Sequence, residues 1–119
     1  MRVPLALCGV LLCGCVVPVA SAQDAVKADP KHYSVVSEND QVRILKVHYG
    51  PHEKSVMHSH PNSVAVMLTD MKAEFTLPDG KKQNMAAKAG ESQYTPAQVH
   101  LPENTGEKGM DLILVELKK

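Results

Sequence analysis

The chain has 119 residues, and its 13 basic and 13 acidic side chains give a formal net charge of zero. It contains one Phe, three Tyr and no Trp. Without a basic patch or an aromatic platform, the composition argues against a nucleic acid partner. The length leaves room for one small domain and no more.

The first 22 residues have the pattern of a secretory signal peptide. Arg2 supplies a positive charge, residues 5–19 form an apolar run, and Ala20-Ser21-Ala22 resembles a cleavage site. The apolar run is too short to cross a membrane as a helix. We therefore expect cleavage after Ala22, a periplasmic or secreted protein exported from a bacterial cytoplasm, and no membrane span.

All three cysteines, Cys8, Cys13 and Cys15, lie inside this segment. Leu12 to Cys15 resembles a bacterial lipobox, so a lipid anchor at Cys15 is an alternative to simple cleavage, which we favour on segment lengths. The mature chain contains no cysteine. It must fold without disulfides, and it has no thiolate for catalysis or for zinc.

The remaining chain predicts an all-β domain. Residues 23–40 are polar and lack periodicity, which indicates a mobile leader, and residues 41–119 form the domain. The only candidate helix is 84–89. Turn signals such as Gly50-Pro51 and Pro78-Asp79-Gly80 separate short extended segments, so an antiparallel sandwich or barrel is expected. The predicted strands are 41–49, 54–60, 63–68, 73–77, 82–86, 92–95, 99–101 and 111–117.

His58 and His60 are separated by one residue just before an apolar strand. In an extended chain alternate side chains share a face, so these two imidazoles should project together, with Ser59 facing the other way. Two converging imidazoles suit a borderline transition metal. An isolated pair of this kind is also common at a polar strand start near a turn.

Two stretches together resemble the motifs of the cupin superfamily. The second motif is matched by Gly90, Pro96, His100 and Asn104, in order. The first is matched by Gly50 and by the His58-Ser59-His60 triplet. The resemblance spans residues 42–117, nearly the whole mature domain, and implies a small antiparallel β-barrel or jelly roll. It also implies a homodimer paired through sheet edges.

The chain departs from the cupin pattern in several places. Gly50 lies two residues too far from His58, which indicates an enlarged turn. Gln98 stands where the second motif has glycine, and one residue is missing before His100. Val64 and Ala65 occupy the places of the acidic ligand, and neither side chain binds a metal. Met71 replaces a glycine in the turn that follows.

By this resemblance the ligand set reduces to three residues, His58, His60 and His100. Three neutral imidazoles can hold a divalent transition metal, Zn²⁺, Fe²⁺, Ni²⁺ or Cu²⁺, and leave positions open for water or a small-molecule ligand. Some cupin-like dioxygenases acting on thiols and diketones use three histidines without the glutamate. The alternative is an interior in which the histidines bond to one another, to Gln93 or to water.

The resemblance also makes Gln93, Tyr94 and Gln98 candidates for a ligand pocket, with one of Gln93 and Tyr94 expected to face the site. There Gln93 could hydrogen-bond a ligand and Tyr94 could act as a weak acid, unless these side chains simply satisfy neighbouring backbone. His48 and His52 are expected on the surface, and His32 in the leader carries no signal. The expected core-filling methionines are Met57, Met67 and Met85.

Three classes of function remain open from the sequence. The first is a metal-dependent cupin acting on a small molecule, as a dioxygenase or an isomerase. The second is a non-catalytic periplasmic module that captures a small ligand or a metal. The third is a structural β-barrel that binds no metal.

Overall fold

The computed structural model describes residues 22–119, so residues 1–21 of the predicted signal peptide, with the lipidation alternative at Cys15, lie outside the described residues. The described part contains one short helix, α1 (Ala25–Ala28), and otherwise strands. In chain order these are β1 (Tyr33–Glu38), β2 (Val42–Tyr49), β3 (His58–His60), β4 (Ser63–Met67), β5 (Met71–Thr76), β6 (Lys82–Ala87), β7 (Ser92–Thr95), β8 (Gln98–Asn104) and β9 (Met110–Leu117). Within residues 22–119, no helix is long and apolar enough to cross a bilayer.

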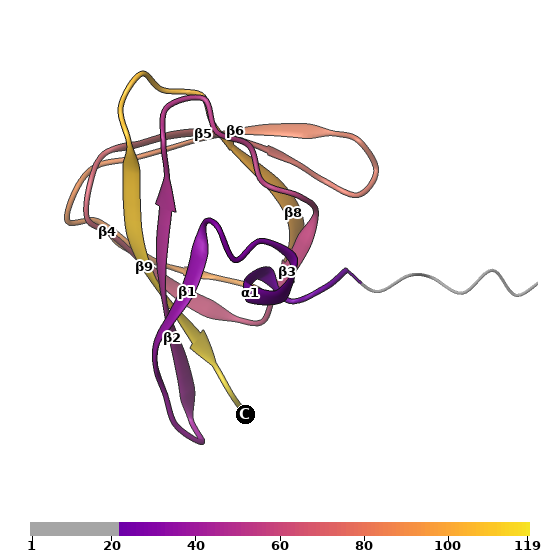
Figure 1. The fold of residues 1–119 in the computed structure, drawn as a ribbon, viewed down its shortest axis with the longest axis vertical. Coiled ribbons are helices and arrows are strands. Elements are labelled where there is room, and N and C mark those ends of the chain that lie inside the picture. The colour runs from indigo at the N-terminus through magenta and orange to yellow at the C-terminus, as the bar shows by residue number, and fades with distance from the viewer. Residues whose placement is uncertain (1–21) are drawn as a thin grey trace, which may run out of the picture.

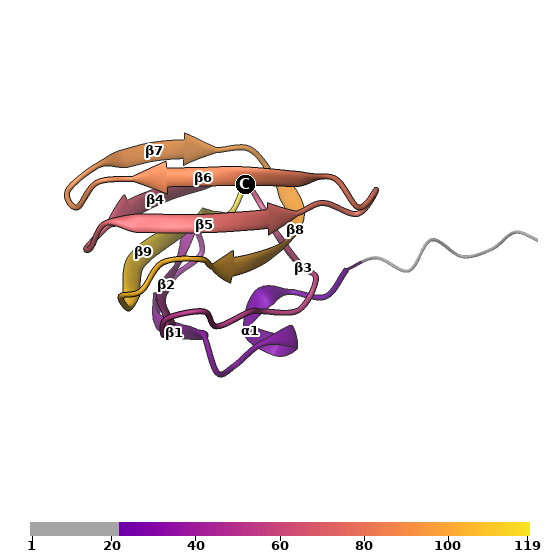
Figure 2. The ribbon, with the colours of Figure 1, turned by 90° about the horizontal axis from the view of Figure 1, so that it is seen from above.

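The strands form two antiparallel sheets that face each other (Figures 1 and 2). One sheet has the order β1-β2-β9-β4-β7 and the other β3-β8-β5-β6. The all-β antiparallel prediction is therefore confirmed, and its form is a jelly roll of two sheets rather than one closed barrel. The core lies between the sheets and is centred on inward-facing residues of β2 and β9, with Leu45, Val47, Tyr49, Met110 and Leu114 all buried.

The mobile leader predicted over residues 23–40 is wrong, because this segment folds onto the domain. The Asp24 side chain caps α1 by accepting from the Lys27 backbone N–H, and Ala25 is fully buried. Tyr33 begins β1, which pairs with β2 and adds an edge strand to the larger sheet. One-turn helices and short exposed strands leave no periodic pattern in a sequence, so composition alone could not reveal them.

The segment before α1 also covers the outer edge of β3. The Ser59 N–H donates to the Gln23 carbonyl over 2.8 Å, and Asp24 forms a parallel bridge with Ser59. Since β3 is an edge strand of the smaller sheet, this contact fixes the short strand that carries His58 and His60.

Two further expectations need correction. Residues 84–89, the candidate helix, belong mostly to β6, which pairs with β5 along its whole length. The predicted strand 54–60 is regular only over His58–His60, with one isolated bridge between Lys54 and Glu103. The residues between Lys54 and His58 belong to the enlarged turn that follows Gly50.

Candidate metal centre

Pairing between β3 and β8 brings the three predicted histidines together. His58 lies opposite His100, and His60 is two residues further along β3 on the same face. Directly paired residues of antiparallel strands project to the same side, so all three rings point into the space between the sheets. The exposed fractions are 0% for His58, 5% for His60 and 4% for His100.

The three rings form a tight cluster. Their centroids are 4.8 Å apart for His58 and His60, 4.9 Å for His58 and His100, and 5.2 Å for His60 and His100. One ligand nitrogen from each ring lies within 4.8 Å of the other two. Nitrogens bound to one ion at about 2.0–2.1 Å cannot be more than about 4.2 Å apart, so small side-chain rotations suffice for coordination.

The hydrogen bonds of His58 and His60 leave nitrogens free on the inner side of the cluster. His58 Nδ1 donates to the Val56 carbonyl over 2.8 Å, and His60 Nδ1 lies 2.8 Å from a Glu116 carboxylate oxygen. Among the described residues, His58 Nε2 and both nitrogens of His100 are buried without a hydrogen-bond partner, as is His32 Nε2 outside the cluster. Such orphaned nitrogens are costly unless something else binds them, and a metal ion fits this donor set.

The electrostatics keep these rings in the form that binds metals. Burial lowers the pKa of His58 to about 4, helped by the neighbouring His60 ring and partly opposed by the Val56 carbonyl. Burial, with His60 and His58 beside it, lowers the pKa of His100 to about 2. Both imidazoles are therefore neutral at pH 7, which is the state that coordinates a metal.

A cavity of about 140 Å³ lies next to the cluster, with His60 and His100 in its wall. Apolar side chains from both sheets line most of it, among them Met67, Met71, Phe75, Met85, Met110 and Leu112. A mainly apolar space with a few polar groups is the usual form of a small-molecule site.

The predicted pocket residues divide according to their strand positions. Gln93 and Gln98 line the cavity. Tyr94 does not line it and is 57% exposed, so its placement in the pocket is wrong. Alternate residues of β7 face opposite sides of the sheet, which turns Tyr94 outward when Gln93 faces the cavity.

The other histidines stand apart from the cluster. His48 and His52 are exposed and pair with Asp111 and Glu107, as expected for surface residues. His32 differs from the expectation: its ring is buried, stacks on Tyr49 at 4.2 Å, and bonds to Asp29 over 2.6 Å. It escaped the sequence analysis because it lies in the segment taken for a leader.

Residues of the cupin-like motifs have clear structural roles. Asn104 is buried, and its side-chain amide donates to the carbonyls of Gly50 and Lys108, while its oxygen accepts from the Gly106 N–H. It thus fastens the loop after β8 to the end of β2. Gly90 has φ +86°, a left-handed conformation that favours glycine, in the turn before β7.

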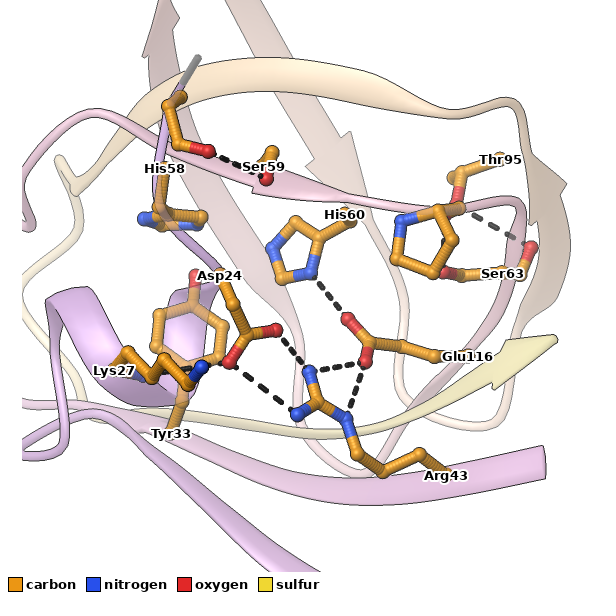
Figure 3. A network of polar contacts seen from close by, with 12 residues as sticks. Asp24, Lys27, Tyr33, Arg43, His58, Ser59, His60, Ser63, Thr95 and Glu116 are labelled. Carbon is orange, nitrogen blue, oxygen red and sulfur yellow. Dashed lines mark hydrogen bonds and ion pairs between the residues drawn. The ribbon is translucent and has the colours of Figure 1, made fainter. Parts of the chain in front are cut away.

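A buried polar network that was not predicted from the sequence lies behind His60 (Figure 3). Glu116 of β9 bonds to His60 and to Arg43 of β2, and Arg43 also pairs with Asp24. A signal for it existed: Glu116 shares an inward face with Leu112 and Leu114, where an acidic residue is unusual. Val64 and Ala65, by contrast, bring no carboxylate to the cluster.

Comparisons with known proteins place the fold. No protein-family model and no curated protein matches the chain. Among solved structures, a cupin domain from Bordetella pertussis is similar with a TM-score of 0.68 and 20% identity, over 73% of this chain and 92% of that one.

Two further solved structures agree with this match. A protein with a double-stranded β-helix domain from Klebsiella pneumoniae has a TM-score of 0.56 and 25% identity, over 71% of this chain and 70% of that one. An RmlC-like cupin family protein from Methanocaldococcus jannaschii has a TM-score of 0.58 and 18% identity, over 72% and 78%. The resemblance predicted from the two histidine motifs is thereby confirmed, and the chain has the double-stranded β-helix fold of the cupin superfamily.

Proposed function

We propose that this protein binds one divalent transition metal through His58, His60 and His100 and receives a small molecule in the adjacent cavity. The observation that supports this most directly is the set of buried, unpartnered nitrogens on His58 and His100. When bound, such a metal supplies a Lewis acid or an oxygen-activating centre with open coordination positions. The chain's own contribution is to orient three imidazoles and to shield them from bulk water.

The three-imidazole donor set favours a group of metals rather than a single one. Three imidazoles favour Zn²⁺, Fe²⁺, Ni²⁺ or Cu²⁺ over harder cations such as Mn²⁺, because the carboxylate of the first motif is missing. The proposed location is the periplasm or the exterior of a bacterial cell, on the pattern of residues 1–22.

The proposed activity is that of an oxygen-dependent dioxygenase or an isomerase. A second candidate is a non-catalytic metal or ligand carrier, which is favoured by the chemistry of the cavity wall. Among the described lining residues, the one carboxylate is that of Glu91, which is exposed, so the wall offers no buried acid–base pair. Oxygen consumption by the metal-loaded protein with candidate thiols and diketones separates the two candidates.

Titration of the metal-free protein with Zn²⁺ and Co²⁺ tests the ligand assignment. The protein is expressed from its full sequence without an affinity histidine tag, and we expect one ion per chain. His58→Ala and His100→Ala should each weaken binding by at least about 100-fold, since each removes a ligand. His52→Ala, which removes an exposed histidine, is the matched control. Unchanged binding by both cluster variants would show that the ligands are elsewhere.

A further inference from the structure

The wall of the cavity beside the histidine cluster is almost free of charge. Among the described residues that line it there is no lysine and no arginine, and the one carboxylate belongs to the exposed Glu91. Apart from a metal bound to the histidines, a charged group buried there would find no partner of opposite sign in the described wall except the exposed Glu91, and burial of an unpaired charge is strongly unfavourable.

The two tyrosines in the wall are neutral and already bonded. The Tyr33 and Tyr49 hydroxyls lie 2.6 Å apart and hydrogen-bond to each other. Burial raises the pKa of both well above the ordinary tyrosine value, so neither becomes an anion in the physiological range. The neutral polar groups left to meet a ligand are the hydroxyls of Ser92 and Thr95, the amides of Gln93 and Gln98, and the rings of His60 and His100.

The remaining surface is apolar and adaptable. Four methionines, Met67, Met71, Met85 and Met110, line the cavity, and their flexible thioethers accommodate ligands of varied shape. The volume of about 140 Å³ is close to that of apolar protein cavities, about 150 Å³, that accept benzene.

We propose that, apart from any group that binds the metal, the ligand of this cavity is an uncharged, mainly apolar small molecule about the size of a monocyclic aromatic ring. One polar group of the ligand points toward the histidines, and the glutamine amides hydrogen-bond a second. This inference deepens the proposed function and rests on its small-molecule part. It excludes substrates that bury an ammonium group, such as amino acids, because no buried carboxylate among the described wall residues pairs with that cation.

Methyl NMR of methionine-labelled, metal-free protein tests the inference without the attraction of a metal. Toluene, benzoate and benzylammonium serve as probes of equal shape and different charge. We expect toluene to shift the methyl signals of the four lining methionines while Met57, which lies outside the cavity, stays unchanged. Benzoate and benzylammonium should bind at least tenfold more weakly than toluene. This difference should be the same in the Glu91→Gln variant and in the wild-type protein.

The outcomes of this experiment are separate from those of metal binding. Equal or tighter binding of either charged probe would overturn the inference, as would toluene shifts absent from the four lining methionines. Neither result depends on whether the protein takes up Zn²⁺, which the titration described above measures independently.

A different observation, the network behind His60, supports a second inference. Glu116 is 2% exposed, and one of its oxygens lies 2.8 Å from His60 Nδ1. Its other oxygen accepts from Arg43, at 2.7 Å from Nε and 2.6 Å from Nη2. Arg43 extends the network to Asp24, in the segment that covers the edge of β3 (Figure 3).

The chemistry of this network determines how His60 faces the cluster. An ionised carboxylate only accepts hydrogen bonds, so the proton of a neutral His60 ring lies on Nδ1 and the lone pair on Nε2. The Arg43 guanidinium pairs with the buried carboxylate and keeps its charge compensated. Carboxylate partners of this kind orient a ligating histidine and increase its basicity.

We infer that Glu116 is the positioning residue of His60 and provides, behind a ligand, the negative charge that the first cupin motif provides as a ligand. Val64 and Ala65 stand where that acidic ligand would fall, and Glu116 comes instead from β9. The expected effect of Glu116 on metal affinity rests on the proposed metal binding. Its expected effect on the His60 ring does not.

Glu116→Gln tests this role with little change of shape. We expect Zn²⁺ affinity to fall by about 10- to 100-fold, as for other second partners of metal-bound histidines. Glu107→Gln, which breaks the exposed His52–Glu107 pair, is the matched control and should bind Zn²⁺ like the wild type. Unchanged affinity in Glu116→Gln would overturn the role.

Nitrogen NMR of the histidine rings in the metal-free protein provides an independent readout. In the wild type we expect His60 to carry its proton on Nδ1, whereas in Glu116→Gln the second tautomer should appear, because an amide can donate as well as accept. A wild-type His60 with its proton on Nε2 would contradict the inference even if Zn²⁺ binds. If Zn²⁺ does not bind, the His60 tautomer still tests the role of Glu116. Failure of metal binding and failure of this inference are therefore distinguishable.

Discussion

At the scale of single residues, burial lowers the pKa of two members of the histidine cluster. His58 and His100 are enclosed by the two sheets, and each ring lies about 5 Å from the other and from His60. Protonating His58 or His100 would place a cation beside the neighbouring rings in an environment of low polarity. The resulting neutral rings suit a metal, and they make the metal-free protein sensitive to acid.

We therefore predict that the metal-free protein loses stability as the pH falls below 6.5. The ordinary histidine pKa is 6.5, whereas in the folded protein it is about 4 for His58 and about 2 for His100. The unfolded chain then binds more protons than the folded one, so the free energy of unfolding is at its full value above pH 6.5 and decreases below it. Between about pH 6.5 and pH 5 the loss should be about 2 kcal/mol for each ring.

Urea unfolding at several pH values measures this loss. His48→Ala, which removes an exposed ring, should keep the wild-type dependence, and His100→Ala should make it shallower. A free energy of unfolding that stays constant or increases from pH 6.5 to pH 5 would contradict the assigned environment of the cluster.

At the scale of elements, the loop after β8 depends on Asn104. Its side chain makes hydrogen bonds with Gly50, Gly106 and Lys108, three backbone groups from two segments far apart in the chain. The conformation of this loop in turn determines where β8, with His100, meets the end of β2.

We predict that Asn104→Ala destabilises the protein by about 2–4 kcal/mol, because it leaves several buried backbone groups without partners. Thermal unfolding followed by circular dichroism measures the effect. Asn84→Ala, at an exposed position of β6, should change the stability by no more than about 0.5 kcal/mol. Equal effects of the two substitutions would show that the Asn104 contacts contribute little.

The N-terminal elements α1 and β1 are a second case in which a short element supports the site. The backbone of Ser59, between two of the cluster histidines, pairs with the segment before α1, and β1 adds a strand to the larger sheet. A segment held in this way is protected from proteases, whereas exposed hairpin tips are cleaved.

Limited trypsin digestion should therefore cleave after Lys81 and Lys82, at the tip of the β5–β6 hairpin, well before Lys27 or Lys31. Lys27 lies in α1, and Lys31 pairs with Glu53. Mass spectrometry of early fragments identifies the first sites. Early cleavage after Lys27 or Lys31 would support the mobile leader that the polar composition suggested.

At the scale of the whole molecule, the sequence predicted the fold better than the surroundings of the site. Alternating residues and turn signals located most strands, and the His58, His60, His100 and Asn104 pattern indicated the cupin fold. These features are local or regularly spaced. In the structure, strand pairing assembles these segments into two sheets and brings the three histidines into one cluster.

What the sequence did not reveal depends on contacts between distant segments. Glu116 becomes a partner of His60 only when β9 crosses behind β3, across 56 residues of chain. Tyr94 was placed in the pocket because the resemblance does not specify which face of β7 it occupies. The fold of Asp24 and Tyr33 against the domain likewise depends on long-range partners, which no local pattern encodes.

The metal content of the protein as purified tests the central claim most directly. The full sequence is expressed without an affinity histidine tag, the protein is isolated from the periplasm, and its metals are quantified by mass spectrometry. We predict close to one equivalent of Fe, Ni, Cu or Zn per chain, lost in His58→Ala and retained in His52→Ala. A wild-type protein that carries no metal and takes up none on titration would contradict the three-histidine metal site.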